Sequence, residues 1–246
     1  MSKVLYGILN YRRSIDNTKE IYESLPADDH KDILIIRKDS MNFHDKAKFK
    51  DITMKADNSV AKSKNMILKH AQKNGYDYCF IIEDDVIIKD DRAFHKYTVL
   101  MDELDYPVLF YGYDNRNRVL GNIKPNPCFA IRVSDDREIY CSRNACSSVM
   151  AFKISDDMRM FDESMEVLET EILLWDLKED GKIQSYGFFP DIPMSWECFD
   201  RTEEIKTRIM TPEQGGSDLQ KRGIQFKLDV EADKFLQFLQ SKYEEA

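Results

Sequence analysis

The stretch that decides the fold reads YDYCFIIEDDVII and covers residues 76–88. Its first part is apolar and aromatic. Three carboxylates follow at Glu83, Asp84 and Asp85, and apolar residues then resume. An apolar run of this length with polar residues at its end is typical of a strand buried on both faces. The carboxylates that follow it are either a solvated strand end or a group that holds a cation.

Strand-like and helix-like segments alternate before this stretch. Residues 3–11 (KVLYGILNY) and 32–40 (DILIIRKDS) are strand-like. Residues 18–25 (TKEIYESL) and 57–75 (DNSVAKSKNMILKHAQKNG) carry apolar side chains at helical spacing, and Gly75 is placed as a C-terminal cap. Strand, helix, strand, helix and strand predict an α/β fold, a mainly parallel sheet with helices on its faces.

Each of these three strands is followed by polar residues. The polar exits are residues 10–13, 38–40 and 83–85. In sheets of this kind, ligands gather at the carboxyl ends of the strands. We therefore expect a single site, at one edge of one sheet.

The rest of the chain predicts further elements around this core. Apolar periodicity predicts a helix at 94–104, a strand at 107–113 and a hairpin about a DD turn at 128–142. It then predicts a strand at 147–154, a helix at 165–182 and a terminal helix at 230–246. The 165–182 helix should present Leu168, Ile172 and Trp175 on one face. The terminal helix should present Phe235, Leu236 and Leu239.

Composition is that of a globular protein. The 246 residues are 42% hydrophobic and 11% aromatic, with a net charge of −9, which gives no global basic field for nucleic acid. No apolar run approaches the roughly 20 residues of a membrane span. The five cysteines fit no CxxC pattern and indicate reduced thiols. We expect a cytoplasmic protein without a membrane partner, made of one domain over residues 1–246.

The carboxylate cluster has the chemistry of a metal site. Residues two apart in an extended chain share a face, so Glu83 and Asp85 should lie together. Two neighbouring carboxylates repel, and a divalent cation relieves that repulsion. Oxygen ligands favour Mg²⁺ or Mn²⁺, which typically bind through one or two carboxylates and substrate phosphates.

Residues 57–88 resemble a motif of the GT-A fold in nucleotide-sugar-dependent glycosyltransferases, especially the family 2 type. Lys64-Asn65 is similar to the family's basic–Asn pair, and Glu83 to Asp85 is similar to its DxD motif. The resemblance implies that Asp85 is the first metal ligand and Glu83 a second. It also implies that Glu83 or Asp84 lies near the ribose and sugar, and that Lys64 and Asn65 belong to the nucleotide-sugar site.

The loop after the first strand extends the resemblance, which covers about residues 3–183 at the level of motifs. The sequence ILNYRR resembles the family's nucleotide loop. It implies that Asn10 and Tyr11 meet the nucleoside, with Tyr11 as a stacking surface, and that Arg12 or Arg13 meets phosphate. Asp39 stands where the family keeps an aspartate that touches the base. A half-buried tyrosine and solvated arginines are the alternative for this loop.

A second match, FDESMEVLETEILLWDLKEDGK, resembles the family segment in which a carboxylate at a helix start faces the acceptor. It implies a general base at Glu169 or, second, at Glu171. The alternative is a helix-start acid favoured by the helix dipole. Thr170 departs from the family pattern because it interrupts the usual acidic pair.

The expected protein ligands of the metal also depart from the family pattern. Many GT-A enzymes add a histidine ligand near the C-terminus, but His30, His44, His70 and His95 all lie in the first half. A third protein ligand would have to come from residues around PDIPMSWECFD, and water is the alternative; the candidates there are Asp191, Glu197 and Asp200.

The resemblance divides the domain into three parts. Residues 1–90 form a nucleotide-sugar half, 91–200 an acceptor half, and 201–246 a C-terminal loop and helix. The expected activity is a metal-dependent hexosyl- or pentosyltransferase that uses a nucleotide diphosphate sugar, with UDP favoured.

The acceptor is inferred from size and local charge. Small GT-A enzymes of bacteriophages that glycosylate hydroxymethylcytosine in DNA have this size, and the lysine-rich stretch 45–73 would suit phosphate. A second basic and aromatic mixture follows at Tyr113, Arg116, Arg118, Lys124, Phe129 and Arg132. We therefore expect hydroxymethylcytosine or its glucosylated form as acceptor. A saccharide acceptor and a non-catalytic nucleotide-binding module are the alternatives.

Overall fold

The computed structural model of the chain describes its central sheet, its main helices and several short strands. The described residues are 2–10, 15–25, 31–38, 52–56, 59–84, 86–88, 92–111, 127–134, 137–142, 146–165, 169–184, 189–191, 196–198, 237–238 and 241–242.

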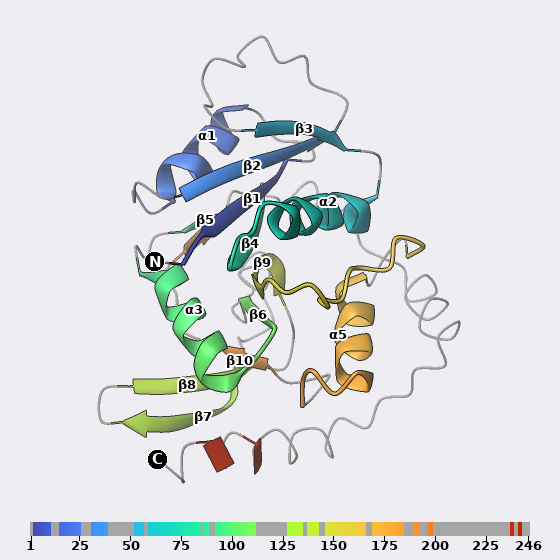
Figure 1. Ribbon diagram of the computed structural model, residues 1–246. Helices are drawn as coiled ribbons and strands as arrows, with labels where there is room; N and C mark the ends of the chain where they lie inside the picture. The colour runs from blue at the N-terminus through green and yellow to red at the C-terminus, as the bar shows by residue number, and fades with distance from the viewer. Residues whose placement is uncertain are drawn as a thin grey trace, which may run out of the picture.

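A six-stranded mixed sheet forms the centre of the molecule, with strand order β3-β2-β1-β4-β9-β6 (Figure 1). Four strands are mutually parallel: β1 (Val4–Asn10), β2 (Lys31–Lys38), β3 (Ile52–Ala56) and β4 (Tyr78–Glu83). The other two, β9 (Cys146–Lys153) and β6 (Val108–Tyr111), continue the sheet, and β9 runs antiparallel to both of its neighbours. The α/β fold with a mixed, mainly parallel sheet is confirmed.

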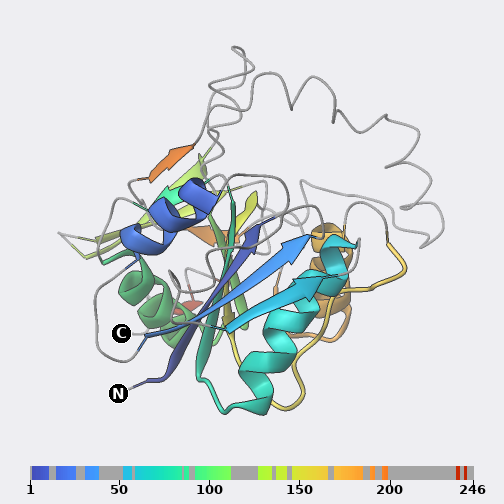
Figure 2. The ribbon, with the colours of Figure 1, turned by 90° about the horizontal axis from the view of Figure 1, so that it is seen from above.

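Helices cover both faces of this sheet (Figure 2). They are α1 (Ile15–Ser24), α2 (Val60–Lys73), α3 (Ala93–Leu104) and α5 (Glu169–Glu179). On one face, Tyr6 and Phe80 are register partners, and the ring centroid of Phe94 in α3 lies 4.7 Å and 4.5 Å from theirs. On the other face, Gly7 lies directly beneath Ile67 of α2. Helices therefore bury both faces of the sheet, which explains why its strands are apolar over nearly their whole length.

Smaller sheets flank the central one. Strands β7 (Pro127–Ser134) and β8 (Arg137–Ser142) form the predicted hairpin, and β10 (Phe189–Asp191) pairs with β8. After the carboxylate cluster, β5 (Val86–Ile88) pairs with β11 (Trp196–Cys198) instead of continuing the central sheet.

Three helices end in the same backbone arrangement. After α2, the N–H of Tyr76 donates to the carbonyl of Ala71 and that of Gly75 to Gln72, while Gly75 has a φ of +65°. Corresponding bonds close α3 at Asp105 and α5 at Gly181, both with positive φ. This is the Schellman motif, and Gly75 and Gly181 stand where the sequence predicted helix ends.

The structure differs from the predicted elements in several places. Strand β3 was not predicted, because a five-residue edge strand that contains a lysine resembles a surface loop. Helix α1 begins at Ile15, inside the expected loop, where Asp16 in the first turn favours a helix start. Of the predicted terminal helix, only residues 237–238 and 241–242 are described, and these are helical.

The predicted apolar face of α5 is incomplete. Ile172 is buried and Trp175 is half-buried against the core, as predicted, but Leu173, Leu174 and Leu177 are buried as well. Leu168 lies outside the described residues.

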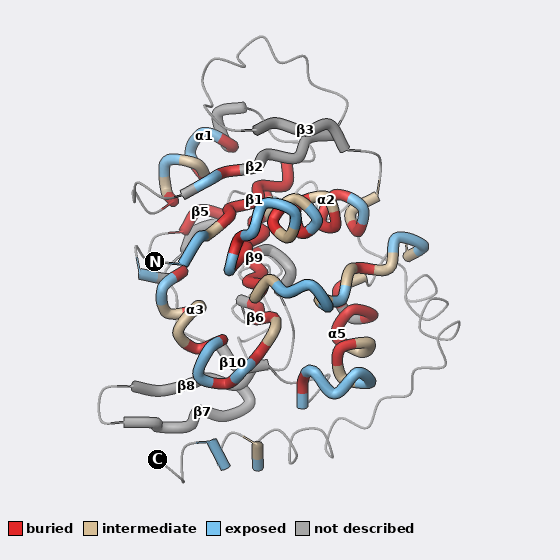
Figure 3. Tube along the Cα trace, in the orientation of Figure 1, coloured by how far each residue is buried: buried red, intermediate tan, exposed pale blue. Residues whose placement is uncertain are grey.

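The core is one cluster of apolar side chains that spans the sheet and its helices (Figure 3). Cys79 is fully buried in it, and burial raises the pKa of its thiol, as expected for a structural cysteine. Among the described helices, none has the length and apolar composition that a bilayer crossing requires.

The close approach of β1 and α2 at Gly7 generates a test. A Cβ at this position would lie 2.4 Å from Cγ2 of Ile67. We expect Gly7→Ala to lower the free energy of unfolding by roughly 1–3 kcal/mol, because overpacking forces neighbouring side chains to move. Urea denaturation at pH 7 measures the loss.

The double variant Gly7→Ala/Ile67→Ala serves as the control. Removing the Ile67 side chain relieves the clash, so the two losses should fall short of additivity by about 1 kcal/mol or more. Strict additivity would show that the Cβ of residue 7 is accommodated by other means.

Candidate active site

Three strands of the sheet end side by side at one edge. Asn10, the last residue of β1, is the register partner of Arg37 in β2, and Leu9 is the partner of Glu83 at the end of β4. Helix α2 lies between the parallel strands β3 and β4, so its first turn begins at this same edge. The polar strand exits expected from the sequence therefore converge on one edge.

The carboxylate cluster stands at the middle of that edge. Glu83 is half-buried and Asp84 is 4% exposed at the end of β4, while Asp85 lies outside the described residues. Their carboxylates are hard oxygen donors, which fit Mg²⁺ or Mn²⁺. Within the described part of the chain, no group of three or more His, Cys, Asp or Glu side chains is close enough to hold a metal ion.

Strand β11 runs beside this cluster. Cys198 is the register partner of Val86, the residue that follows Asp85, and Glu197 is the partner of Ile87. The segment predicted to supply a third ligand thus pairs with β5, and Glu197 lies opposite Ile87, two residues beyond Asp85. Asp191 lies apart from it on β10, opposite Tyr140.

Asn10 is turned toward helix α1. It is 4% exposed, and its Nδ2 donates to Oγ1 of Thr18, which is fully buried. This bond fixes the first helix against the end of β1. The remaining predicted nucleotide residues, Tyr11, Arg12, Arg13 and Asp39, lie outside the described residues.

The first turns of α2 contain an unusual set of buried polar residues. Ser59 caps the helix, and its side chain accepts a bond from the N–H of Lys62. Ser63, Lys64 and Asn65 then follow in sequence, and all three are at most 2% exposed. Buried polar groups require partners. The Ser63 hydroxyl donates to the Ser59 carbonyl one turn earlier, whereas Lys64 and Asn65 bond to other parts of the protein.

Lys64 bonds to the start of α5. Its Nζ lies 2.8 Å from Oε1 of Glu169 and 3.3 Å from Oγ1 of Thr170. The Lys64 side chain is fully buried and that of Glu169 is 14% exposed. The structure therefore brings together two residues that the sequence assigned to different halves of the site.

Asn65 bonds to the segment before α5. Its Oδ1 accepts from the N–H of Phe161 at 2.9 Å, and its Nδ2 donates to the Phe161 carbonyl and to Oε1 of Glu163, both at 2.9 Å. Lys69, one turn further along α2, reaches the same Glu163 oxygen at 3.2 Å. In the structure the side chain of Asn65 thus anchors residues 161–163.

The ion pair sets the charge state of Glu169. Burial by itself would raise the pKa of this carboxyl, but the Lys64 ammonium and the Thr170 hydroxyl hold the pKa below its ordinary value. Glu169 is therefore ionised at neutral pH. Glu171, the second predicted base, lies in α5 with its side chain outside the described set.

Two of the four histidines are described. His70 is on α2, where burial lowers its pKa, and His95 is exposed on α3. His30 and His44 lie outside the described residues.

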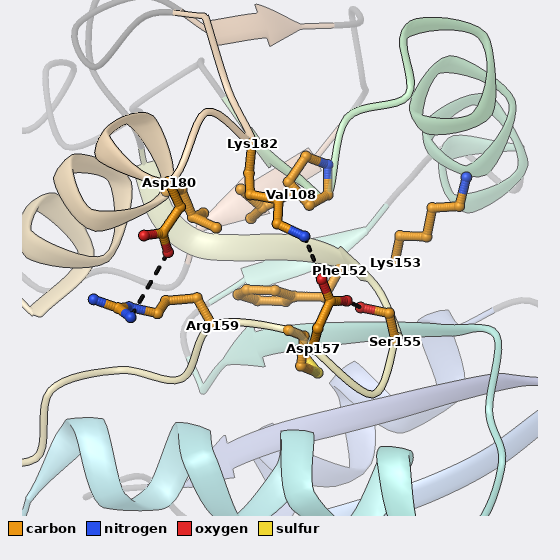
Figure 4. Close-up of a pocket in the computed structure, with 11 residues that line it drawn as sticks. Val108, Phe152, Lys153, Ser155, Asp157, Arg159, Asp180 and Lys182 are labelled. Carbon is orange, nitrogen blue, oxygen red and sulfur yellow. Dashed lines mark hydrogen bonds and ion pairs between the residues drawn. The ribbon is translucent and has the colours of Figure 1, made fainter.

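Two cavities lie at the opposite edge of the sheet. The smaller, of about 40 Å³, is lined by residues of β9, α5 and the segments that follow them (Figure 4). Ion pairs join Lys182 to Asp157 and Arg159 to Asp180 across it. A neighbouring cavity of about 390 Å³ shares Lys153 and Lys182. Because ligands of such sheets bind at the carboxyl ends of the strands, we assign neither cavity to the candidate site.

Sequence reasoning missed three residues that organise the site, namely Thr18, Glu163 and Thr170 as a bonding partner. Thr18 bonds to Asn10 from eight positions away, whereas Glu163 and Thr170 contact α2 from 98 and 106 positions away. Glu163 and Thr170 lie in the segment that resembles the family motif, but nothing in that segment indicates that they bond to α2.

Comparison with known proteins finds likeness in structure alone, since no family model and no curated protein matches the sequence. The mannosyltransferase PcManGT from Pyrobaculum calidifontis, in complex with GDP-Man and Mn²⁺, is similar with a TM-score of 0.59 and 10% identity, over 92% of this chain and 65% of that chain. S. aureus TarS 1-349 is similar with a TM-score of 0.50 and 16% identity, over 72% of this chain and 54% of that chain.

A synthetase of CMP:2-keto-3-deoxy-manno-octonic acid in complex with CTP is matched with a TM-score of 0.49 and 11% identity, over 89% of this chain and all of that chain. This chain spans just under two thirds of the mannosyltransferase chain and about half of the TarS chain. The likeness to the mannosyltransferase and to TarS shows a GT-A-like fold, and the fold alone.

The lowered pKa of Glu169 predicts a pH dependence of stability. A carboxyl with a depressed pKa stabilises the fold above its ordinary value of 4.5, and this contribution is lost as the pH falls below it. We expect Glu169→Gln to flatten the decline in the free energy of unfolding between about pH 5 and pH 3. Urea denaturation across this range tests it.

Glu179→Gln is the matched control, because Glu179 is an exposed carboxylate in the last turn of the same helix. This variant should follow the wild-type curve. A Glu169→Gln curve parallel to the wild type would contradict the ionised, paired state of Glu169.

Proposed function

We propose that this protein is a metal-dependent glycosyltransferase that moves a sugar from a nucleotide diphosphate sugar, with UDP as the favoured nucleotide, to an acceptor hydroxyl. The observation that carries this proposal is the edge at which β1, β2 and β4 end. Glu83 and Asp84 lie at the carboxyl end of β4 there, and α2 begins at the same edge. The likeness in fold to a mannosyltransferase bound to GDP-Man and Mn²⁺ supports it.

The donor side of the proposed site is built from the strand ends. Asp85 and Glu83 would hold Mn²⁺ or Mg²⁺, which neutralises the charge of a diphosphate. Asp84, between these two carboxylates, and Asn10, at the end of β1, would lie near the ribose and sugar, and the loop residues Tyr11 to Arg13 and Asp39 would meet the nucleoside and phosphates. Lys64 and Asn65 contribute by bonding α2 to the start of α5 and to residues 161–163.

The acceptor side is assigned to the start of α5. A carboxylate there, Glu169 or Glu171, would take the proton of the attacking hydroxyl as it bonds to the sugar carbon and the nucleotide diphosphate departs. The ion pair with Lys64 supports this placement, because it joins the first residue of α5 to the helix that begins at the donor edge.

For the acceptor itself we propose hydroxymethylcytosine, or its glucosylated form, in bacteriophage DNA. The basis is the basic and aromatic composition of residues 113–132, of which Phe129 and Arg132 belong to β7 of the hairpin sheet. A target base in a duplex would have to be flipped out to reach the donor.

A nucleotidyltransferase would use a related sheet, a nucleotide and a metal. Enzymes of that class carry a glycine-rich loop after the first strand, and residues 10–17, NYRRSIDN, contain no glycine. The sequence therefore favours sugar transfer over nucleotidyl transfer.

Nucleotide binding is the first test. We expect UDP with Mn²⁺ to raise the midpoint of thermal unfolding by several degrees, because a ligand that binds only the folded state stabilises it by mass action. Mn²⁺ alone and UDP with EDTA should give smaller shifts. Absence of any shift with UDP, GDP, CMP and TDP, each with and without metal, would refute the proposed donor site.

Asp85→Asn tests the metal assignment. Loss of the carboxylate should abolish the shift that depends on both UDP and Mn²⁺, while the unfolding midpoint without ligand stays within a few degrees of wild type, because an amide group has nearly the same size as the carboxylate it replaces. The matched control is Asp156→Asn, an exposed aspartate beyond the end of β9 at the opposite edge. Wild-type turnover of a UDP-sugar by Asp85→Asn would show that this residue is not a ligand.

The mass of the reaction products tests which molecule accepts the sugar. Hydroxymethylated, glucosylated and unmodified DNA, together with a set of oligosaccharides, would be incubated with a panel of sugar nucleotides and analysed by mass spectrometry. Addition of one hexose or pentose to hydroxymethylated DNA is the expected result. Addition to an oligosaccharide alone would replace the DNA acceptor with a saccharide.

A further inference from the structure

Lys64 is a buried lysine that solvent does not reach. Its side chain has no exposed surface, and its ammonium lies 2.8 Å from Glu169 and 5.2 Å from the centre of the Phe161 ring. A buried charge is strongly destabilising unless it is paired and hydrogen-bonded. The Lys64 ammonium therefore requires the Glu169 carboxylate in the folded protein.

This requirement bears on what Glu169 can do. Lys64 and Thr170 both bond to Oε1 of Glu169, and the side chain keeps little contact with solvent. A general base works best when its pKa lies near the working pH. An ammonium at hydrogen-bonding distance opposes protonation of the carboxylate, so Glu169 is poorly suited to accept a proton.

The pair also joins two parts of the site. Lys64 belongs to α2, which begins at the edge where the strands end, and Glu169 is the first residue of α5. Three bonds of Asn65 to residues 161–163 reinforce the same connection. Together these contacts fix the start of α5 relative to the donor edge.

We propose that Lys64 and Glu169 are a positioning pair, which sets the first turn of α5 against α2, and that Glu169 is not the group that accepts the acceptor proton. This inference rests on the proposed function for the exclusion of Glu169 as the base, and on the structure alone for the pair.

A double-mutant cycle tests the pair without any assay of activity. Lys64→Met and Glu169→Gln should each lower the midpoint of thermal unfolding by roughly 10 °C, because each leaves a buried charge or its partner unpaired. The variant with both substitutions should recover most of that loss, since neither charge remains. Lys69→Met, which breaks the exposed pair with Glu163 on the same helix, should change the midpoint by no more than about 3 °C.

Losses that simply add in the double variant would overturn the positioning pair. This readout is independent of the proposed function, because it does not require a substrate. If wild-type protein binds no nucleotide and transfers no sugar, the proposed function fails, and the cycle still decides whether the pair exists.

Steady-state kinetics tests whether Glu169 accepts the proton. In the Lys64→Met/Glu169→Gln variant, the acid limb of the pH dependence of kcat/KM should persist, while kcat falls because the first turn of α5 is no longer held against α2. Loss of the acid limb in this variant would return the role of base to Glu169.

Discussion

The charge of Lys64 is the constraint on which the site depends. An ammonium without solvent contact is tolerated only beside a carboxylate, and Glu169 supplies it at 2.8 Å. Because the two residues belong to different helices, satisfying one charge fixes the relative position of two elements that are far apart in the chain. The neighbouring Asn65 does the same for residues 161–163 by using both atoms of its amide group. A short polar stretch on one helix thereby determines where the first turn of α5 lies.

The central sheet supplies the other half of the arrangement. Its parallel strands are covered on both faces by helices, so their side chains pack into one core and polar residues lie at the strand ends. In sheets of this kind, ligands bind at the carboxyl ends. Asn10 and Asp84 are buried there although they are polar. Polar residues in such positions are rarely there for stability alone, and this is the physical reason to place chemistry at this edge.

Much of the fold was predictable from the sequence, because apolar runs and helical spacing are local signals. Strands β1, β2, β4 and β9, helices α2 and α3, and the hairpin of β7 and β8 were all expected. Strand β3 was not, since an edge strand needs no apolar run. The convergence of the strand exits was predictable, because parallel strands end at the same edge. The partner of Lys64 was not, because no local pattern links position 64 to position 169. The sequence assigned both residues to the site from their types, and only the fold shows that they bond to each other.

The pairing of β5 with β11 has a consequence for how the molecule assembles. The carboxylate cluster joins a strand of the central sheet to a strand of a separate two-stranded sheet, and the partner of that second strand lies more than 100 residues further along the chain. Contacts between such distant positions form late in folding, because loop closure must come first. During synthesis the central sheet can form up to β9 before β11 has been made. We therefore expect the corner that contains the carboxylate cluster to be completed among the last steps of folding, after the sheet that supports it.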